Sequence, residues 1–182
     1  MGILRLPLVY PERREGPFHL LPAPQACYNK AMKFLVDSML GRLAKWLRIL
    51  GYDTLYFSSL DDNDLVRIAR AEGRMVLTRD REMLRRRGID SLLIESDDFR
   101  EQIHQVLHDL NLNLDRSFSR CPVCNSPLQR VAKEAVRERV PPYVFRTQER
   151  FSLCPQCGKI YWRGTHWQRM RERLKRLEEE AL

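Results

Sequence analysis

Four cysteines arranged in two Cys-Pro-x-Cys pairs place the strongest constraint on how this chain can fold. The pairs run from Cys121 to Cys124 and from Cys154 to Cys157, and they use four of the five cysteines. Two short loops that each present paired thiolates can form a tetrahedral sulfur site, a ligand set that suits zinc. Because four thiolates leave no open coordination position, the pattern predicts a structural zinc site and not a catalytic one.

The segment between the two pairs, residues 125 to 153, is longer than the about 15 to 20 residues of the commonest spacing. It contains a Pro141-Pro142 break, and the residues around that break include several with high β propensity. These are Val131, Val136, Val140, Val144 and Phe145. The spacing therefore predicts a zinc ribbon with a hairpin or an extra strand in its enlarged middle. A redox-active pair and a disulfide pairing without metal are the alternatives.

Length and composition indicate the class of protein and its compartment. The chain has 182 residues, a formal net charge of +8 and a pI near 9.5, enough for one α/β domain and a small metal module. No apolar run approaches the roughly 20 residues that cross a bilayer, and no signal-peptide pattern opens the sequence. We therefore expect a cytoplasmic protein without membrane contact, in which clustered cysteines ligate metal and Cys27 remains an inert thiol.

Residues 1 to 31 differ in composition from the rest of the chain. Half of the ten prolines lie there, at positions 7, 11, 17, 22 and 24, and no helical or alternating apolar pattern survives between them. The segment is predicted to form an arm outside the folded domain. It is either an extension that precedes a start at Met32 or an arm that docks a partner.

From residue 33 onward, apolar strand patterns alternate with helical patterns. The predicted strands cover residues 33–36, 54–57, 75–78 and 91–94, and the predicted helices cover 38–50, 62–73, 82–87 and 98–110. Alternation at this spacing is typical of a parallel sheet with helices on both faces. The fold class is therefore predicted to be α/β.

Acidic residues follow the predicted strands. Asp37 and Asp80 come directly after the first strand and just after the third, and Asp61, Asp62 and Asp64 follow the second. Because the carboxyl ends of parallel strands share one edge of the sheet, these carboxylates can gather there and hold magnesium or manganese. Each also has a simple structural alternative, since Asp caps helices and favours their first turn.

Several motifs, in the same order along the chain, resemble the Mut-seven C-terminal RNase family. They are Phe34 to Arg48 (FLVDSMLGRLAKWLR), Leu77 to Arg81 (LTRDR), the two cysteine pairs, and Tyr161 to Trp167 (YWRGTHW). The resemblance spans residues 33 to 174 and leaves the Pro-rich segment outside it.

The resemblance implies a PIN-like, Rossmann-like nuclease domain over residues 32–115, a zinc ribbon over 116–165 and a charged carboxyl-terminal helix over 166–182. It implies a metal-dependent ribonuclease whose acidic positions match Asp37 and Asp80 best, with Asp62 and Asp64 favoured over Asp61 as the middle acid. Glu95, Asp97 and Asp98 follow the fourth strand without a convincing motif for a further acid.

Basic residues complete the expectation of a nucleic-acid substrate. Arg42, Lys45 and Arg48 recur at a spacing of three on the first predicted helix, which is expected to place them on one side of it, near Asp37. The other candidates for binding single-stranded RNA are Arg79, Arg85 to Arg87 and His166. Aromatic residues of the ribbon, among them Trp162 and Trp167, either stack on bases or form the ribbon's small core. A non-catalytic module that binds nucleic acid or the ribosome is the alternative function. The last helix is expected to be solvated or to face a partner.

Overall fold

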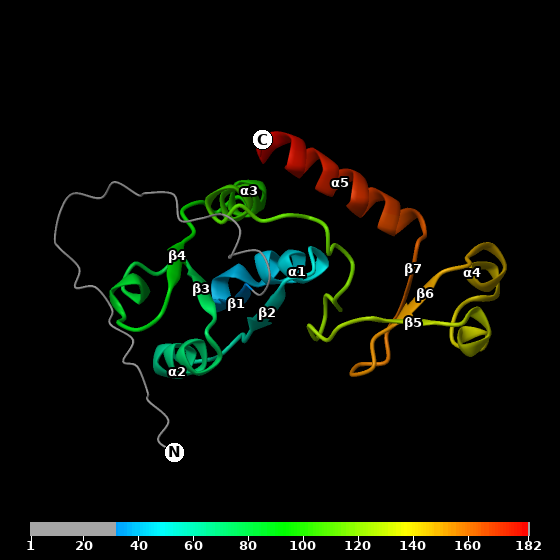
Figure 1. Cartoon of the computed structure of the whole chain (residues 1–182), viewed down its shortest axis with the longest axis horizontal. Coiled ribbons are helices and arrows are strands. Elements are labelled where there is room, and N and C mark those ends of the chain that lie inside the picture. The colour runs from blue at the N-terminus through cyan, green and yellow to red at the C-terminus, as the bar shows by residue number, and fades with distance from the viewer. Residues whose placement is uncertain (1–31, 182) are drawn as a thin grey trace, which may run out of the picture.

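The structure, a computed structural model, describes residues 32–181. The predicted Pro-rich arm and Cys27 therefore lie outside the described residues. The chain folds as a parallel α/β sheet followed by a smaller antiparallel sheet and a long final helix, which lie in that order in Figure 1.

Four parallel strands form the first sheet, as the sequence predicts. They are β1 Lys33–Val36, β2 Asp53–Tyr56, β3 Met75–Thr78 and β4 Ser91–Leu93, in the order β2-β1-β3-β4. The chain adds strands first on one side of β1 and then on the other. The strand order thus reverses between β1 and β3, which is where parallel α/β sheets open a crevice at their carboxyl edge.

Helices cover both faces of this sheet. The short 3-10 helix η2 Ser38–Leu40 leads into α1 Gly41–Ile49, which packs with α3 Phe99–Asp109 on one face, and α2 Asp62–Glu72 covers the other. Successive strand residues point to opposite faces. Phe34 and Val36 therefore join the core with α1 and α3, whereas Leu35 packs against α2.

The ends of α2 and α3 agree with their sequence signals. The Asp61 carboxylate caps α2 by accepting hydrogen bonds from the backbone N–H groups of Asn63 and Asp64, and Gly73 ends the helix in the left-handed conformation. Asp98 caps α3 in the same way, through the N–H groups of Arg100 and Glu101.

The helix predicted over residues 82–87 is wrong, because only a 3-10 turn, η3 Met83–Arg85, forms there. Met83 is its one buried residue, so the segment has no apolar stripe that could hold a longer helix against the sheet. Gly88 then turns the chain toward β4 with a φ of 72°.

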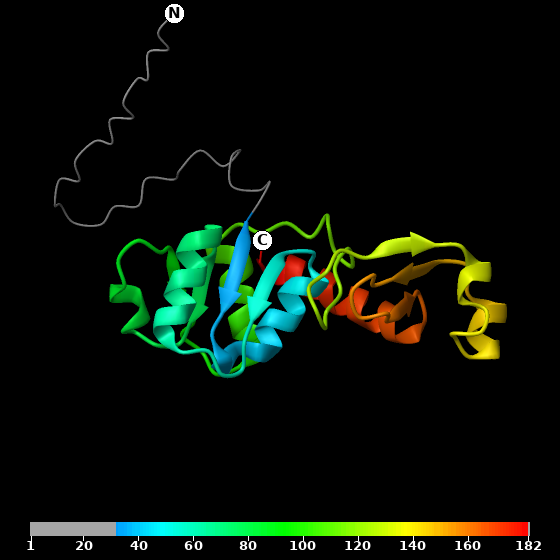
Figure 2. The same ribbon diagram turned by 90° about the horizontal axis from the view of Figure 1, so that it is seen from below.

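The second sheet is antiparallel and carries one of the cysteine pairs in its hairpin. Its strands are β5 Gln129–Val131, β6 Phe151–Leu153 and β7 Ile160–Trp162, in the order β5-β6-β7. We call residues 119–162 the four-cysteine module. It lies to one side of the parallel sheet in Figures 1 and 2.

The expected β-structure around Pro141-Pro142 is wrong for most of that segment. Beyond β5, the chain between the cysteine pairs forms the 3-10 helix η4 Lys133–Val136 and the helix α4 Pro142–Thr147. Pro142 occupies the first helical position, where a missing N–H costs nothing. Val136 and Val140 fold back onto Phe151, so these valines pack as a small core instead of pairing as a strand.

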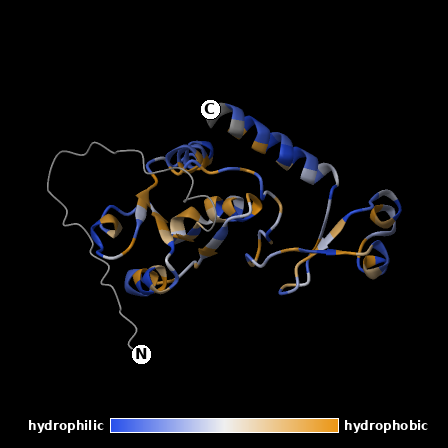
Figure 3. Ribbon diagram, viewed as in Figure 1, coloured by the Kyte–Doolittle hydropathy of each residue, from blue (hydrophilic) through white to orange (hydrophobic). Residues whose placement is uncertain are grey.

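The final helix, α5 Thr165–Ala181, returns to the parallel α/β part (Figure 1). Leu174 and Leu177 are buried in the same core as α1 and α3. Figure 3 shows most of α5 as hydrophilic with a few apolar positions. The expectation of a solvated or partner-facing helix is therefore wrong for this apolar face, which packs within the chain.

Buried polar groups join the four-cysteine module to the parallel sheet. The guanidinium of Arg48, on α1, donates hydrogen bonds to the carbonyl oxygens of Thr54 (2.9 Å) and Val123 (2.8 Å). The Asn125 side chain accepts from the Thr54 N–H at 3.0 Å and donates to the Asp53 carboxylate at 2.8 Å. Arg48 therefore anchors the module, and the prediction that it lies on a nucleic-acid-binding face is wrong.

Candidate functional site

Asp37 stands where β1 ends, at the point where the strand order reverses. Its backbone N–H donates to Leu77 O at 3.0 Å, which ties it to β3. The residue occupies the N-cap position of η2, yet its side chain makes no capping hydrogen bond. Its two oxygens instead accept from the hydroxyls of Thr78 (2.9 Å) and Ser38 (3.1 Å). The capping alternative for Asp37 therefore does not account for its carboxylate.

Asp80 is brought to the same place by the hydroxyl of Thr78, which is fully buried at the end of β3. Thr78 Oγ1 donates to Asp37 Oδ2 and accepts from the Asp80 N–H, each at 2.9 Å. The two hydrogen bonds to this one hydroxyl oxygen therefore bring Asp37 Oδ2 and the backbone nitrogen of Asp80 to neighbouring positions. The Asp80 carboxylate accepts from the N–H of Glu82 at 2.8 Å, which fixes the following turn. The helix that the structural alternative expected Asp80 to cap does not form.

The turn after Asp37 is held by Tyr56, the last residue of β2. The Tyr56 hydroxyl donates to Ser38 O at 3.0 Å, and its ring lies against Gly41. A Cβ atom at Gly41 would come within 2.8 Å of the Tyr56 ring and hydroxyl, so a larger residue would displace one of them. The packing of Tyr56 on Gly41 therefore positions the segment that carries Asp37.

The three acids after β2 have different local roles. Asp61 caps α2, and hydrogen bonds from the backbone N–H groups of Asp64 and Asn63 lower its pKa. Asp64 forms an ion pair with Arg67 at 2.8 Å. Asp62 is exposed, and its carboxylate has no hydrogen bond or ion pair with any described residue. Of the three, Asp62 has the carboxylate that remains available to a ligand.

Arg79 lies between Thr78 and Asp80 and pairs with Asp97, from the segment after β4. Its Nε atom is buried without a hydrogen-bond partner among the described residues. Arg79 thus contributes to the carboxyl edge of the sheet, with part of its charge already compensated.

The other predicted nucleic-acid contacts are spread over two helices. Arg42 and Lys45 lie on α1, and the Arg42 guanidinium is 4.3 Å from the centre of the Phe99 ring. His166 is exposed in the first turn of α5, beside β7 and therefore at the four-cysteine module. The structure does not gather Arg42, Lys45 and His166 at one point.

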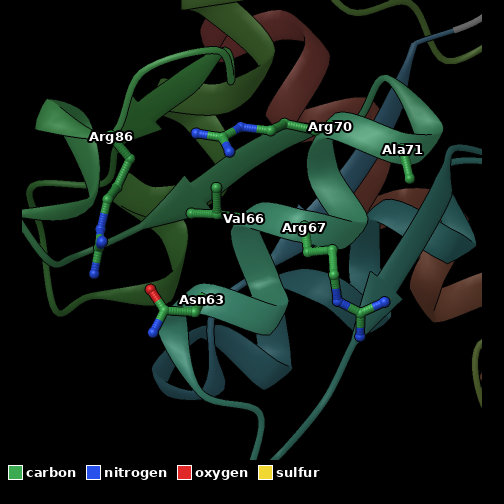
Figure 4. Close-up of a pocket in the computed structure, with 6 residues that line it drawn as sticks. All are labelled: Asn63, Val66, Arg67, Arg70, Ala71 and Arg86. Carbon is green, nitrogen blue, oxygen red and sulfur yellow. The ribbon is translucent and has the colours of Figure 1, made fainter.

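Three arginines line a shallow pocket on the α2 face of the sheet. Its walls are formed by α2 and the loop before β4, and Figure 4 shows its residues Asn63, Val66, Arg67, Arg70, Ala71 and Arg86. Arg67 pairs with Asp64, and Arg70 donates to the carbonyl oxygen of Arg87. The pocket contains none of the candidate acidic residues, and two of its three guanidiniums already have partners.

The four predicted ligand cysteines converge. Their sulfur atoms all lie within 4.8 Å of one another. Close contacts join the two motifs: the sulfurs of Cys121 and Cys157 are 3.6 Å apart, and those of Cys124 and Cys154 are 3.3 Å apart. A zinc ion with Zn–S bonds of about 2.3 Å would hold its sulfurs about 3.8 Å apart. The four side chains are free thiols in the structure, so they form no disulfide.

The two cysteine loops repeat one backbone geometry. In each loop, the residue directly after the second cysteine donates its N–H to the carbonyl oxygen of the first, as Asn125 does to Cys121 and Gly158 to Cys154. Asn125 and Gly158 have φ values of 70° and 71°. Only glycine, and less readily asparagine, adopts this conformation cheaply, which explains the residue type at both positions.

Tyr161 supports one of the thiols. Its hydroxyl lies 3.1 Å from the Cys121 sulfur. Burial raises the pKa of Cys121, but hydrogen bonds from Tyr161 and from backbone N–H groups outweigh it and lower the pKa to about 6. Burial and the neighbouring thiols raise the pKa of Cys124 to about 12. Because burial and neighbouring thiols raise the pKa of Cys124, the four thiols do not all ionise without a positive charge beside them. A zinc ion would supply that charge, so these residues fit zinc.

No such group of carboxylates forms among the described residues. In the part of the chain that the structure describes, the four cysteines are the one set of three or more potential ligands found at that spacing. Asp37 and Asp80 are linked through Thr78, whereas Asp62 stands on the first turn of α2.

Sequence reasoning missed the roles of three residues that organise these sites. Thr78 stands in the sequence only as part of a motif, although a threonine at a strand end beside Asp80 could have signalled a bridging hydroxyl. Tyr161 resembles the other aromatics of the ribbon, and no local pattern indicates its contact with Cys121. Asp97 is one of three candidates for a further acid, and its pairing with Arg79 depends on the fold.

The fold and sites define a two-part protein: a parallel α/β domain with carboxylates at its strand ends, and an antiparallel module with a four-thiol site. The chain belongs to the Mut7-C RNAse domain family, whose model matches residues 32–174. Neither the curated proteins nor the solved structures include a match to the chain. The family indicates a ribonuclease-type function with RNA as substrate. Over residues 32–181, no helix has the length and apolar character to cross a membrane.

Proposed function

We propose that this protein is a metal-dependent ribonuclease that hydrolyses RNA phosphodiester bonds at the carboxyl edge of its parallel sheet. The observation that carries the proposal is the shared hydrogen bonding of Thr78, which joins the end of β1 to the turn after β3. Two acids from different strands are thereby held at the position where the strand order reverses, where α/β sheets bind ligands.

Asp37 and Asp80 are the residues that would hold magnesium or manganese. Both offer carboxylate oxygens, the ligands that these hard cations prefer, and magnesium is commonly bound by only one or two carboxylates. A divalent ion held by these carboxylates would supply an activated water and would neutralise charge on the phosphodiester. Asp62 and Asp64 are proposed to serve the same site from α2. We favour Asp62, since Asp64 is already paired with Arg67.

The remaining residues position these acids and the substrate. Thr78 orients the Asp37 carboxylate by donating to it, and Tyr56 holds the turn that carries Asp37. Arg79, which pairs with Asp97, is proposed to limit the repulsion among the acids and to attract a phosphate. Arg42, Lys45 and His166 are proposed as contacts to the strand outside the reacting centre.

We further propose that residues 32–115 form a PIN-like domain, 116–165 a zinc ribbon and 166–182 a charged helix. The supporting observations are the parallel sheet, the antiparallel sheet β5-β6-β7 and the four converging cysteines. Zinc would be held by Cys121, Cys124, Cys154 and Cys157, and a reducing compartment such as the cytoplasm keeps these thiols available. The ribbon would aid the binding of single-stranded RNA.

The experiment that tests the nuclease is cleavage of labelled single-stranded RNA and DNA with magnesium, manganese or EDTA. Asp37→Asn and Asp80→Asn should each lower the rate about 100-fold or more, because each removes a charged group from the reacting centre. Asp90→Asn is the matched control, since Asp90 is exposed just before β4, at the opposite edge of the sheet. Cleavage by the two active-site variants at the wild-type rate, or full cleavage in EDTA, would refute the proposal. Binding of RNA without cleavage would favour the non-catalytic module.

A further inference from the structure

Two arginines from different helices contact the same aromatic ring. The guanidinium carbons of Arg42, on α1, and Arg173, on α5, lie 4.3 and 5.4 Å from the centre of the Phe99 ring. Arg173 is also 5.3 Å from the ring centre of Trp46. Both rings are nearly buried, with exposed fractions of 5% for Phe99 and 9% for Trp46. The aromatic floor therefore brings two like charges together at a fixed place.

Arg100, at the start of α3, and Arg176, one turn after Arg173, extend this group. We call Arg42, Arg100, Arg173 and Arg176 the arginine cluster. No member has a side-chain hydrogen bond or ion pair with any residue that the structure describes. By contrast, Arg48, Arg67 and Arg74 all have such partners. Among the described side chains, the nearby carboxylate of Asp98 offsets the positive charge of the cluster only in part, since that carboxylate already caps α3.

The pKa of Arg173 reflects its burial and this crowding of positive charges. Burial lowers the pKa of Arg173, and the positive charges of Arg42, Arg100 and Arg176 lower it further. Asp98 acts in the opposite direction, but its carboxylate already caps α3 through the N–H groups of Arg100 and Glu101. Like charges held this close cost free energy in the absence of an anion.

The cluster lies at the edge of the sheet that carries the candidate acids. α1 and α3 both begin at the carboxyl ends of strands, and helix amino termini carry partial positive charge. α5 is fixed there because Leu174 and Leu177 are buried against α1 and α3. The position of Arg173 and Arg176 is therefore determined by packing, so the cluster is formed before any ligand arrives.

We propose that the arginine cluster binds consecutive phosphates of a single-stranded RNA, so that α5 forms part of the substrate-binding surface. The inference rests on the proposed function for the identity of its ligand. Four guanidiniums spread over three helices exceed what one phosphate group can use, and guanidinium is the side chain best suited to phosphate. The contacts are to the backbone, so the cluster fixes the path of the strand without reading its sequence.

The test measures binding of a fluorescently labelled single-stranded RNA of about 20 nucleotides by the full zinc-loaded chain in buffer without magnesium or manganese. The double variant Arg173→Gln/Arg176→Gln should weaken binding about tenfold or more. It should also reduce the slope of log K against log salt by about 0.7 for each phosphate that is no longer neutralised. The double variant Arg42→Gln/Arg100→Gln changes the other two helices and should act in the same direction, which guards against a local defect in α5.

The matched control is Lys33→Gln/Lys175→Gln, which removes the same charge. Lys33 begins β1 at the opposite edge of the sheet, and Lys175 is an exposed residue of α5. If both arginine doubles bind RNA as the control does, the proposed site is refuted. Because the proposed cleavage needs the magnesium or manganese that this buffer omits, the outcome is independent of the nuclease test. If the arginine variants lose RNA binding but the wild-type chain never cleaves RNA, the phosphate-binding site is supported and the nuclease proposal is refuted.

Discussion

Replacing Arg48 with methionine should destabilise the protein, because the change removes a buried link between α1 and the four-cysteine module. The side chain is 8% exposed and donates to Thr54 O at 2.9 Å, Val123 O at 2.8 Å and Pro122 O at 3.4 Å. Methionine fills most of the same volume but leaves these acceptors without a donor. An unsatisfied buried acceptor costs roughly 1–3 kcal/mol, and two of the three bonds are short.

The net loss is smaller than the sum of these penalties for two reasons. Burial lowers the pKa of Arg48, so the wild type already bears a desolvation cost, which the thiols of Cys121 and Cys124 and the carboxylate of Asp53 partly offset. Val123 is also half exposed, so water can reach part of that loop. We therefore expect Arg48→Met to lower the free energy of unfolding by about 2–4 kcal/mol.

Urea unfolding of the zinc-loaded protein, followed by circular dichroism, measures this loss. Lys45→Met is the control, because Lys45 is exposed on the same helix and its replacement should change stability by no more than about 0.5 kcal/mol. Limited proteolysis should also cut Arg48→Met faster between the two parts of the chain. If both variants unfold at the same urea concentration, Arg48 does not anchor the module.

Three further outcomes test separate parts of the structure. Thr78→Val should lower RNA cleavage about tenfold or more by releasing the Asp37 carboxylate, whereas Thr78→Ser, which keeps the hydroxyl, should retain most of the activity; equal rates would count against the bridge. Removal of zinc by a chelator, or Cys154→Ser, should unfold the four-cysteine module first, seen as amide exchange in β6 and β7 before β1 and β3; simultaneous exchange would contradict this. Although burial raises the pKa of Asp53, hydrogen bonds from Arg74 and Asn125 lower it below its usual value. Its contribution to stability should therefore be present above pH of about 4 and lost as the pH falls through the lowered pKa, and Asp53→Asn should lose that dependence in acid unfolding curves.

Local patterns predicted the strands and most helices because neighbouring residues determine them. Leu35 between Phe34 and Val36 marks a strand buried on both faces, and Asp61 and Gly73 mark the ends of α2. The segment around Pro142 failed because its valines have high β propensity, while packing on Phe151 decided the outcome. Such tertiary contacts cannot be read from spacing.

The candidate sites also combine features that the sequence predicts with features that depend on the fold. The cysteine pairs and the acids after β1 and β3 follow from motifs, whereas the bridging role of Thr78 depends on two strands being adjacent. The prediction for Arg48 failed because a spacing of three does not keep residues on one side of a helix. At about 3.6 residues per turn, Arg48 lies about 120° around α1 from Arg42, so Arg48 is buried while Arg42 reaches the surface.

The return of α5 to the parallel sheet changes how the chain can be divided. The backbone leaves the α/β part before the first cysteine pair and re-enters it through Leu174 and Leu177. In topological terms the four-cysteine module is an insertion, and the last helix completes the first domain. A deletion that removes α5 would therefore uncover the hydrophobic surface of α1 and α3, whereas a short linker replacing the module could leave that surface covered. Truncation of the carboxyl terminus should therefore disturb the α/β core more than excision of the module does.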